Sequence, residues 1–285
     1  MIFGVGLIGG SVAMALKKAG YSQQIVGIDR NPASLAIAIE LGVIDIATNN
    51  ISEAMKAADL VLIATPVAQI PEILQLIKPH LAPNTVITDA GSTKSDVLRH
   101  AQAILGDLSS QFIGGHPIAG AEKSGVTAAT ADLYQDKNVV LTPTQDTSQH
   151  VISCVTNLWQ CCGAKVSEMS AEMHDGIFAT VSHLPHLLAF ALVNEIALRP
   201  NAEQLFSFAA SGFRDFTRIA GSHPEMWRDI SLANKDALLN EIDAYEAELK
   251  KIKSMLQSAD AAGLHALFKH ASEARNAWAN HNKNN

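Results

Sequence analysis

Short apolar runs alternate with amphipathic stretches over the first 168 residues of the chain. The runs are rich in β-branched residues and have the length of strands, and apolar residues between most of them recur three and four apart, as in helices. The predicted strands are Ile2–Val5, Ile25–Asp29, Val43–Ala47, Leu60–Thr65, Val86–Asp89, Phe112–Gly114, Val139–Thr142 and Ala164–Val166. The predicted helices are Val12–Ala19, Ser34–Leu41, Ile70–Ile77, Lys94–Ile104 and Ser148–Cys161. This alternation predicts right-handed βαβ units and a doubly wound parallel sheet of the α/β class.

The pattern changes at about Met169. Strand signals stop there, and apolar residues recur at helical spacing to the end of the chain. The predicted helical stretches are Ala171–Ala197, Ala202–Ala210, Asp215–Ala220, Pro224–Ser258 and Ala261–Ala279. We therefore predict an α/β domain over residues 1–168 and an all-helical domain over residues 169–285, with no flexible linker between them.

Composition narrows the class of partner and the compartment. The formal net charge of -7 disfavours a nucleic-acid partner held through phosphates. The cysteines, Cys154, Cys161 and Cys162, are odd in number and two are adjacent, which is a poor disulfide framework and typical of a reducing cytosol. The apolar N-terminus lacks the positive n-region of a signal peptide, and no run reaches the roughly 18 apolar residues of a membrane span. We expect a cytoplasmic protein without a membrane partner.

A glycine-rich motif, Gly4-Val5-Gly6-Leu7-Ile8-Gly9, lies between the first strand and the first helix. Gly4 permits a tight turn, Gly6 lets the backbone approach a diphosphate, and Gly9 lets helix and strand pack closely. The free N–H groups at the helix start, at Leu7 and Ile8, favour an anion. The motif predicts a Rossmann-type dinucleotide site.

The second strand ends in Asp29, twenty residues after Gly9. A carboxylate at this place accepts hydrogen bonds from ribose hydroxyls and repels a 2′-phosphate, so NAD is favoured over NADP. Arg30 weakens this preference, because its guanidinium could hold such a phosphate or stack on adenine. The turn after the fourth strand, Thr65-Pro66, is expected to pass near the cofactor.

Two clusters follow later strands of the predicted sheet, at the edge where ligands bind. Ser92 lies in the segment Asp89–Lys94, where it could also be a simple helix cap. His116 lies among glycines just past a strand and on no amphipathic helix face, so a core role is a poor explanation for it. A histidine titrates near neutrality and can take a proton from an alcohol as hydride leaves its carbon.

The third cluster lies in the helical half. His183 and His186 are three apart and share a helix face, and Pro185 between them marks a bend or a first turn. The pair lacks a third ligand, so no metal is predicted. Asp215 and Arg218 are also three apart, and their apolar, Phe-rich surroundings argue against an ordinary surface ion pair.

Taken together and in this order, these clusters resemble the prephenate dehydrogenase family, which includes arogenate (cyclohexadienyl) dehydrogenases. The matching motifs run over most of the chain: Gly4–Ser11, Gly91–Lys94, Gly114–Gly125, Ser182–His186, Asp215–Arg218 and Met226–Asp229. The Gly-His-Pro-Ile-Ala-Gly and Asp-Phe-Thr-Arg-Ile-Ala stretches are specific, whereas the glycine fingerprint is shared with many enzymes.

The resemblance implies an NAD-dependent oxidative decarboxylation of prephenate to 4-hydroxyphenylpyruvate, or of arogenate to tyrosine, in tyrosine biosynthesis. It implies that His116 accepts the proton of the ring hydroxyl and that Ser92 positions this hydroxyl and His116. Arg218 would bind a substrate carboxylate with His186 as a second anchor. Glu122, Asp215 and Trp227 would belong to a network around Arg218. Family members are dimers joined through the helical domain, so a homodimer is expected.

Two other functions fit parts of the sequence. β-Hydroxyacid dehydrogenases share the two-domain plan but rely on a catalytic lysine in the helical half, and no lysine occurs here between Lys165 and Lys235. A nucleotide-sensing protein without catalysis would be expected to lack the histidine or the arginine, and this chain has both His116 and Arg218.

Overall fold

The computed structural model describes residues 1–120 and 123–281. The chain forms two compact units, residues 1–237 and 238–285. The first unit contains the sheet and the helices that precede residue 234. The second contains most of helix α12 (Lys235–Gln257) and helix α13 (Ala261–His281).

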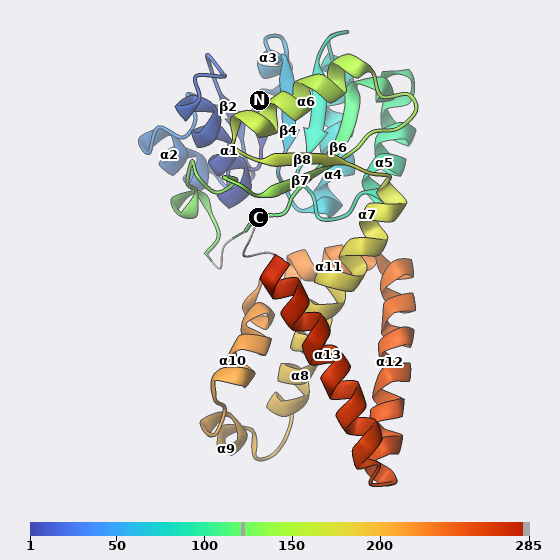
Figure 1. Cartoon of the computed structure of the whole chain (residues 1–285). Coiled ribbons are helices and arrows are strands. Elements are labelled where there is room, and N and C mark those ends of the chain that lie inside the picture. Colours follow the sequence, from blue (N-terminus) through green and yellow to red (C-terminus); the bar gives the residue numbers. More distant parts are fainter. Residues whose placement is uncertain (121–122, 282–285) are drawn as a thin grey trace. The chain divides into compact units, whose positions relative to one another are not determined.

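The strands of the first unit form a single sheet in the order β3-β2-β1-β4-β5-β6-β7-β8 (Figure 1). They are β1 (Ile2–Phe3), β2 (Val26–Ile28), β3 (Ile46–Ala47), β4 (Leu60–Ile63), β5 (Val86–Asp89), β6 (Phe112–Pro117), β7 (Asn138–Thr142) and β8 (Lys165–Glu168). The order reverses between β1 and β4, and in open α/β sheets dinucleotides bind outside the carboxyl ends of the strands at such a point. The predicted α/β sheet is confirmed.

One strand pair departs from the predicted parallel arrangement. Strand β7 runs antiparallel to β6, with Gly114 opposite Thr142 and Pro117 opposite Val139. The described residues between the two strands contain only the short 3-10 turn Val126–Ala128, and without a crossover helix the chain returns in the opposite direction. This pairing also extends β6 to Pro117, beyond the predicted end at Gly114.

Helices cover both faces of the sheet. Helices α1 (Leu7–Lys18) and α6 (Gln149–Cys161) pack on one face, and α4 (Ile70–Ile77) and α5 (Ser95–Leu105) pack on the other, each with its own buried cluster. Helix α4 buries Ile70, Ile73, Leu74 and Ile77, which is the spacing of one helix face. Helix α2 (Pro32–Glu40) contacts β3, and helix α3 (Ile51–Met55) contacts α4 and adds Met55 to the buried cluster on that face.

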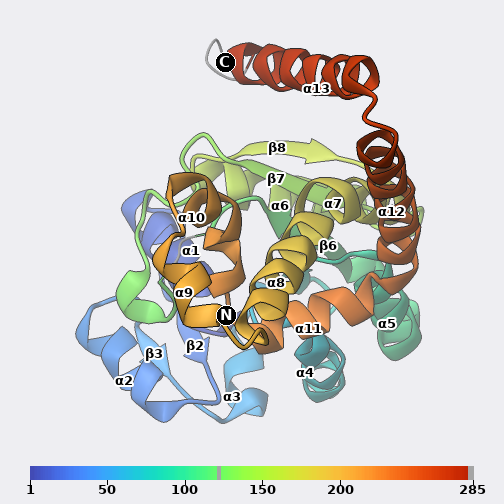
Figure 2. The same ribbon diagram turned by 90° about the horizontal axis from the view of Figure 1, so that it is seen from below.

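After β8 the first unit continues with helices alone within the described residues. They are α7 (Ala171–Phe178), α8 (Leu184–Ala197), α9 (Ala202–Ser207), α10 (Ser211–Thr217) and α11 (Pro224–Ala233). Helix α8 lies between α10 and α11 (Figure 2). The single helix predicted over Ala171–Ala197 is interrupted by a π-helical turn, Ala179–His183. Pro185 follows this turn in the first turn of α8, where its missing N–H group costs no hydrogen bond.

Within the described residues, the segment Ala171–Ala197 is long and apolar enough to cross a membrane by length and composition, because an 18-residue window within it has a mean hydropathy of 1.6. This differs from the expectation that no stretch of the chain qualifies, because a window of this kind tolerates a few polar residues. A core helix of a soluble protein passes the same test. The segment also buries His174, Asp175 and His183, which belong to the cluster described below.

Candidate active site

The glycine-rich turn has the shape of a diphosphate cradle. Gly4 has a φ of +85°, and a Cβ atom on it would lie 2.6 Å from the Ala64 carbonyl oxygen. A Cβ atom on Gly9 would lie 2.1 Å from the Gly4 oxygen, so α1 can approach β1 only with glycine there. Gly6 has no atom within 4 Å of its Cβ position, which leaves the backbone open at the start of α1. These glycines fit the roles expected of them in binding a dinucleotide.

Asp29 follows β2 and closes the same turn. Its carboxylate accepts hydrogen bonds from the backbone N–H groups of Val5, at 2.9 Å, and Asn31, at 2.9 Å. An ionised carboxylate has about four lone-pair sites, so acceptor capacity remains for a ribose. The neighbouring Arg30 is exposed and pairs with Glu72 on α4. Thr65 lies against Gly4, and its buried hydroxyl has no hydrogen-bond partner within the described residues.

A buried ion pair shapes the segment that carries Ser92. Lys94 Nζ pairs with Asp89 Oδ2, and both side chains are fully buried. The Asp89 carboxylate also accepts the N–H groups of Gly91, at 2.7 Å, and Gly115, at 3.1 Å. The pair therefore joins the β5–α5 loop to strand β6. Breaking a buried pair by removing one partner is strongly destabilising, because the other charge is left uncompensated.

Helix α5 is capped by a residue far along the chain. The Asp175 carboxylate accepts the backbone N–H of Lys94, at 2.9 Å, and of Ser95, at 2.8 Å. The structure records no side-chain cap from within the segment, so the simple alternative in which Ser92 caps this helix is not observed. Ser92 itself is partly buried. Asp175 thus holds the loop from the helical part of the unit.

His116 lies inside strand β6, paired with Val140, and is 9% exposed. The expectation that His116 lies just past the strand and outside the core was wrong, because pairing with β7 extends the strand past it. Gly114 and Gly115 serve close packing instead, since a Cβ atom on Gly115 would lie 2.7 Å from the Asp89 backbone oxygen. The buried ring packs edge-on against Phe178 and approaches His174.

Hydrogen bonds determine which nitrogen of His116 can accept a proton. His174 Nδ1 lies 2.8 Å from Asp175 Oδ1, and His174 Nε2 lies 2.8 Å from His116 Nδ1. The carboxylate only accepts, so His174 carries its proton on Nδ1 and, when neutral, offers a lone pair at Nε2. His116 must then donate from Nδ1, which leaves Nε2 with a lone pair. A neutral His116 is thereby held as a base.

Burial keeps both histidines neutral. It lowers the pKa of His116 well below 6.5, and the charges of His174, Lys94 and His183 act in the same direction. Burial also lowers the pKa of His174, although its hydrogen bond to Asp175 opposes the shift. Burial alone would raise the pKa of Asp175, but the hydrogen bonds from His174, Ser95 and Lys94 outweigh it and lower the pKa. The carboxylate therefore stays charged beside two neutral rings.

A second chain of hydrogen bonds reaches the site from the end of α11. The Asn234 amide nitrogen donates to the Asp175 backbone oxygen, at 2.9 Å, and to His183 Nδ1, at 3.1 Å. A neutral His183 consequently carries its proton on Nε2. That buried atom makes no hydrogen bond within the described residues, although the Ser92 backbone lies close to the ring.

His186 and Trp227 form a stacked pair, with ring centroids 3.6 Å apart and planes 20° apart. His183 contacts the same indole edge-on at 6.1 Å, so the two histidines share the expected helix face. His186 donates from Nδ1 to the Ser182 carbonyl oxygen at 2.8 Å, and the charge of Arg218 helps burial to lower its pKa. Arg218 thus lies close enough to His186 to act on it electrostatically.

The remaining predicted residues are exposed or lie outside the described residues. Asp215 lies in the last turn of α10 and Arg218 directly follows that helix. Both side chains and that of Phe216 are exposed, so the expected apolar surroundings are not observed. Pro66 is exposed at the start of the turn after β4. Glu122 lies outside the described residues.

Sequence reasoning missed His174, Asp175 and Asn234. A signal was present for two of them, because an adjacent histidine and aspartate are unusual in a helix as apolar as Ala171–Ala197. Asn234 offered no signal, since an asparagine at the end of a helix is ordinary.

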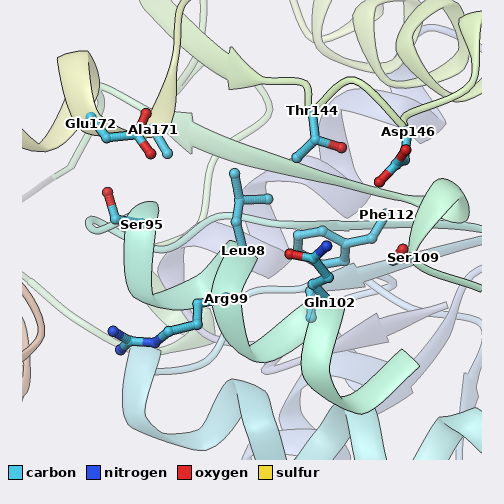
Figure 3. Close-up of a pocket in the computed structure, with 11 residues that line it drawn as sticks. Ser95, Leu98, Arg99, Gln102, Ser109, Phe112, Thr144, Asp146, Ala171 and Glu172 are labelled. Atoms are coloured by element: carbon cyan, nitrogen blue, oxygen red, sulfur yellow. The ribbon is translucent and has the colours of Figure 1, made fainter. Parts of the chain in front are cut away.

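A cavity of about 250 Å³ lies elsewhere, between α5, α7 and the chain after β7 (Figure 3). Ser95, Arg99, Phe112, Asp146 and Glu172 contribute to its lining. None of the predicted site residues described by the structure lines it. The cavity therefore does not contain the predicted catalytic residues, although its lining residue Ser95 donates its N–H to Asp175 of the His116 cluster.

Two family models match the chain. A model described as prephenate dehydrogenase, nucleotide-binding domain, matches residues 12–168. A second, described as prephenate dehydrogenase, dimerization domain, matches residues 170–270.

Individual proteins match over nearly the same length. A prephenate dehydrogenase of Bacillus subtilis is 42% identical over 277 residues, which cover 96% of this chain and 74% of that protein. A cyclohexadienyl dehydrogenase of Zymomonas mobilis is 35% identical over 278 residues, which cover 96% and 94%.

Solved structures separate the family from the rival fold relatives. A prephenate dehydrogenase from Aquifex aeolicus, in complex with hydroxyphenyl propionate and NAD+, superposes with a TM-score of 0.90 at 39% identity over 96% of each chain. A 3-hydroxyisobutyrate dehydrogenase from Salmonella typhimurium superposes with a TM-score of 0.56 at 16% identity, covering 86% of this chain and 93% of that one. The second likeness is one of fold alone.

The neutral state of His183 predicts a loss of stability in acid. Burial lowers its pKa to about 4 in the folded chain, against about 6.5 when unfolded. Its contribution to the free energy of unfolding is therefore complete above about pH 6.5 and is lost as the pH falls through about 4. A difference of this size corresponds to about 3 kcal/mol at most. Glutamine cannot be protonated in this range, so the free energy of unfolding of the His183→Gln variant should fall less steeply with decreasing pH than that of the parent.

Urea unfolding of the parent and the variant at about pH 7, 5.5 and 4.5 measures this slope. His223→Gln removes an exposed histidine and serves as the matched control, with the slope of the parent expected. An unchanged slope in His183→Gln would assign the acid sensitivity to other groups.

Proposed function

Because the chain belongs to the prephenate dehydrogenase family, we propose that it oxidises and decarboxylates prephenate, arogenate or both, with NAD+ as the hydride acceptor. The product is 4-hydroxyphenylpyruvate from prephenate or tyrosine from arogenate, which places the reaction in tyrosine biosynthesis. The observation that carries this proposal is the Asp175–His174–His116 chain of hydrogen bonds. This chain leaves a lone pair on the buried His116 imidazole near the carboxyl end of β6, the edge of the sheet where ligands bind in such folds.

The cofactor fits the glycine turn. NAD+, when bound, accepts the hydride, and Gly4, Gly6, Gly9 and the start of α1 at Leu7 and Ile8 would hold its diphosphate. Asp29 would accept hydrogen bonds from the ribose. The buried hydroxyl of Thr65, a residue that lies against Gly4, has no partner within the described residues, as expected of a group that a ligand satisfies.

His116 is the proposed base. Its Nε2 atom accepts the proton of the ring hydroxyl while hydride leaves the ring carbon that bears this hydroxyl. The ring then loses carbon dioxide, and the bonding pair of the broken C–C bond completes the aromatic ring. Atom balance requires no net proton release, so His116 returns the proton to the phenolic oxygen. Aromatisation drives the reaction, and the chain mainly supplies a base, a cation and orientation.

The other predicted residues surround this step. Ser92 orients the hydroxyl, with its segment held by the buried Asp89–Lys94 pair and by Asp175. Arg218 binds a carboxylate of the substrate, and His186, stacked on Trp227, is the second polar anchor. Asp215 and Glu122 would align Arg218.

The wider assignments follow the family. We propose a division into a dinucleotide-binding domain at residues 1–168 and a helical domain at residues 169–285, a homodimer joined through the helical domain, and a cytoplasmic location. Exposed Val181, Leu198 and Phe208 in the helical part are consistent with a dimer. The β-hydroxyacid dehydrogenase alternative lacks its lysine, and a non-catalytic nucleotide sensor would not need the Asp175–His174–His116 chain.

NADH absorbance tests the proposal directly. Initial rates with prephenate and with arogenate, each crossed against NAD+ and NADP+, should show NADH formation and carbon dioxide release with at least one of the substrates. No turnover of either substrate by a folded, NAD+-binding protein would refute the activity.

Replacing His116 by asparagine keeps a hydrogen-bonding group but removes the base. Turnover should fall by about 10²–10⁴, while NAD+ binding stays nearly intact. The neutral ring is the active form, so kcat/KM of the parent falls as the pH drops through its pKa. Because burial lowers that pKa, the acid limb should lie below about 6.5.

The pH profile separates this role from a structural one. If His116 only supports β6, its replacement should reduce the stability of the protein and leave the acid limb of the kcat/KM profile at the same pH. If His116→Asn keeps near-normal turnover, or loses it with the acid limb unmoved, another group is the base.

Arg218→Ala should weaken substrate binding. A charge-assisted hydrogen bond contributes about 1.5–3 kcal/mol, so KM should rise by about tenfold to a hundredfold or more with little change in kcat. Arg199→Ala, which removes an exposed arginine paired with Glu195, is the matched control. A folded Arg218→Ala protein with the KM of the parent would contradict a carboxylate clamp.

A further inference from the structure

An ion pair spans the proposed cofactor crevice. Arg30 Nη2 pairs with Glu72 Oε2, and the side chains are 65% and 61% exposed. Arg30 comes after Asp29 at the carboxyl end of β2, and Glu72 lies in the first turn of α4, after β4. The two residues are 42 positions apart in the chain, so neither local helix geometry nor a turn brings them together.

The sheet topology fixes where this pair lies. Strand β1 is hydrogen-bonded to β2 on one side and to β4 on the other. The carboxyl ends of these three parallel strands meet at one edge of the sheet, and the glycine-rich turn leaves β1 there. The Arg30–Glu72 pair therefore bridges the two sides of the turn that would hold the diphosphate.

The charges at this edge oppose a phosphate on the ribose. Asp29 and Glu72 carry two negative charges and Arg30 one positive charge, which leaves a net charge of −1 for the three. A 2′-phosphate would add about −1.5 to −2 near neutral pH. A guanidinium is otherwise the side chain best suited to bind such a phosphate, through two parallel hydrogen bonds. Arg30 alone would thus favour the phosphorylated cofactor.

We propose that Glu72 is a specificity-determining residue, which selects NAD over NADP by holding the Arg30 guanidinium in an ion pair and away from a 2′-phosphate. Asp29 and Glu72 then act together. Asp29 faces the ribose hydroxyls directly, while Glu72 compensates the neighbouring cation. The inference rests on the proposed function only in taking the glycine turn as the cofactor site.

The test compares ligands with and without the phosphate. Binding of 2′,5′-ADP and of 5′-AMP is measured by calorimetry for the parent and Glu72→Gln, and kcat/KM is measured with NADP+ and NAD+. Removing one charge near a group of about two charges in a water-exposed site should strengthen 2′,5′-ADP binding and NADP+ use about five- to twentyfold. Binding of 5′-AMP and use of NAD+ should stay within about twofold.

Two further variants identify the cause. Glu53→Gln removes an equally exposed glutamate that pairs with Lys56, so it makes the same change in net charge without touching the crevice, and it should leave the selectivity unchanged. In the double variant Glu72→Gln/Arg30→Gln the gain should disappear, because no guanidinium remains to bind the phosphate.

The outcomes that overturn the proposal are distinct from failure of the proposed function. An unchanged preference in Glu72→Gln, an equal gain in Glu53→Gln, or a gain that persists in the double variant would each refute it. The nucleotide-binding measurements contain no prephenate or arogenate, so they remain decisive even if neither compound is oxidised.

Discussion

A single buried carboxylate connects the parts of this site. Asp175 accepts two backbone N–H groups at the start of α5 and one ring N–H from His174, and its own carbonyl accepts the amide of Asn234. A buried charge of this kind is stable only if its oxygens are satisfied, so the strand–helix loop, α7 and the end of α11 must be assembled together. The chemistry of His116 depends on the same condition, because the proton on His174 is fixed by Asp175. Folding and protonation state are thereby coupled at one residue.

Besides the single charge of Asp175, the loop between β5 and α5 contributes a buried charge pair. Asp89 and Lys94 sit at opposite ends of the short loop that carries Ser92, and the Gly115 N–H ties this loop to the strand of His116. A well-satisfied ion pair is a costly way to stabilise a fold compared with apolar packing, but it restricts geometry strongly. The two candidate catalytic side chains are thus carried by segments that share hydrogen bonds rather than by independent loops.

The sequence predicted those structural features that are determined by residues close together in the chain. The glycine turn, the helix α4 and the alternation of strands and helices are readable because their signals lie within a few positions. The antiparallel β6–β7 pair and the strand position of His116 were missed, since they depend on a segment more than twenty residues away. The contacts of Asp175 with Lys94 and of Asn234 with Asp175 join residues 81 and 59 positions apart, and no spacing rule predicts them. His116 was found for its chemical type, although its surroundings were misjudged.

The π-helical turn at Ala179–His183 sets how α8 is rotated about the helix axis relative to α7. A π turn contains about one residue more than an α turn, and one residue corresponds to about 100° around a helix. His174 before the turn, His183 at its end and His186 after it therefore meet the sheet and Trp227 on faces that a continuous α-helix would not align. Removal of one residue from the turn would leave an intact, apolar helix in which the later histidines point elsewhere. The orientation of these histidines therefore depends on the number of residues in the turn more than on the identity of their side chains.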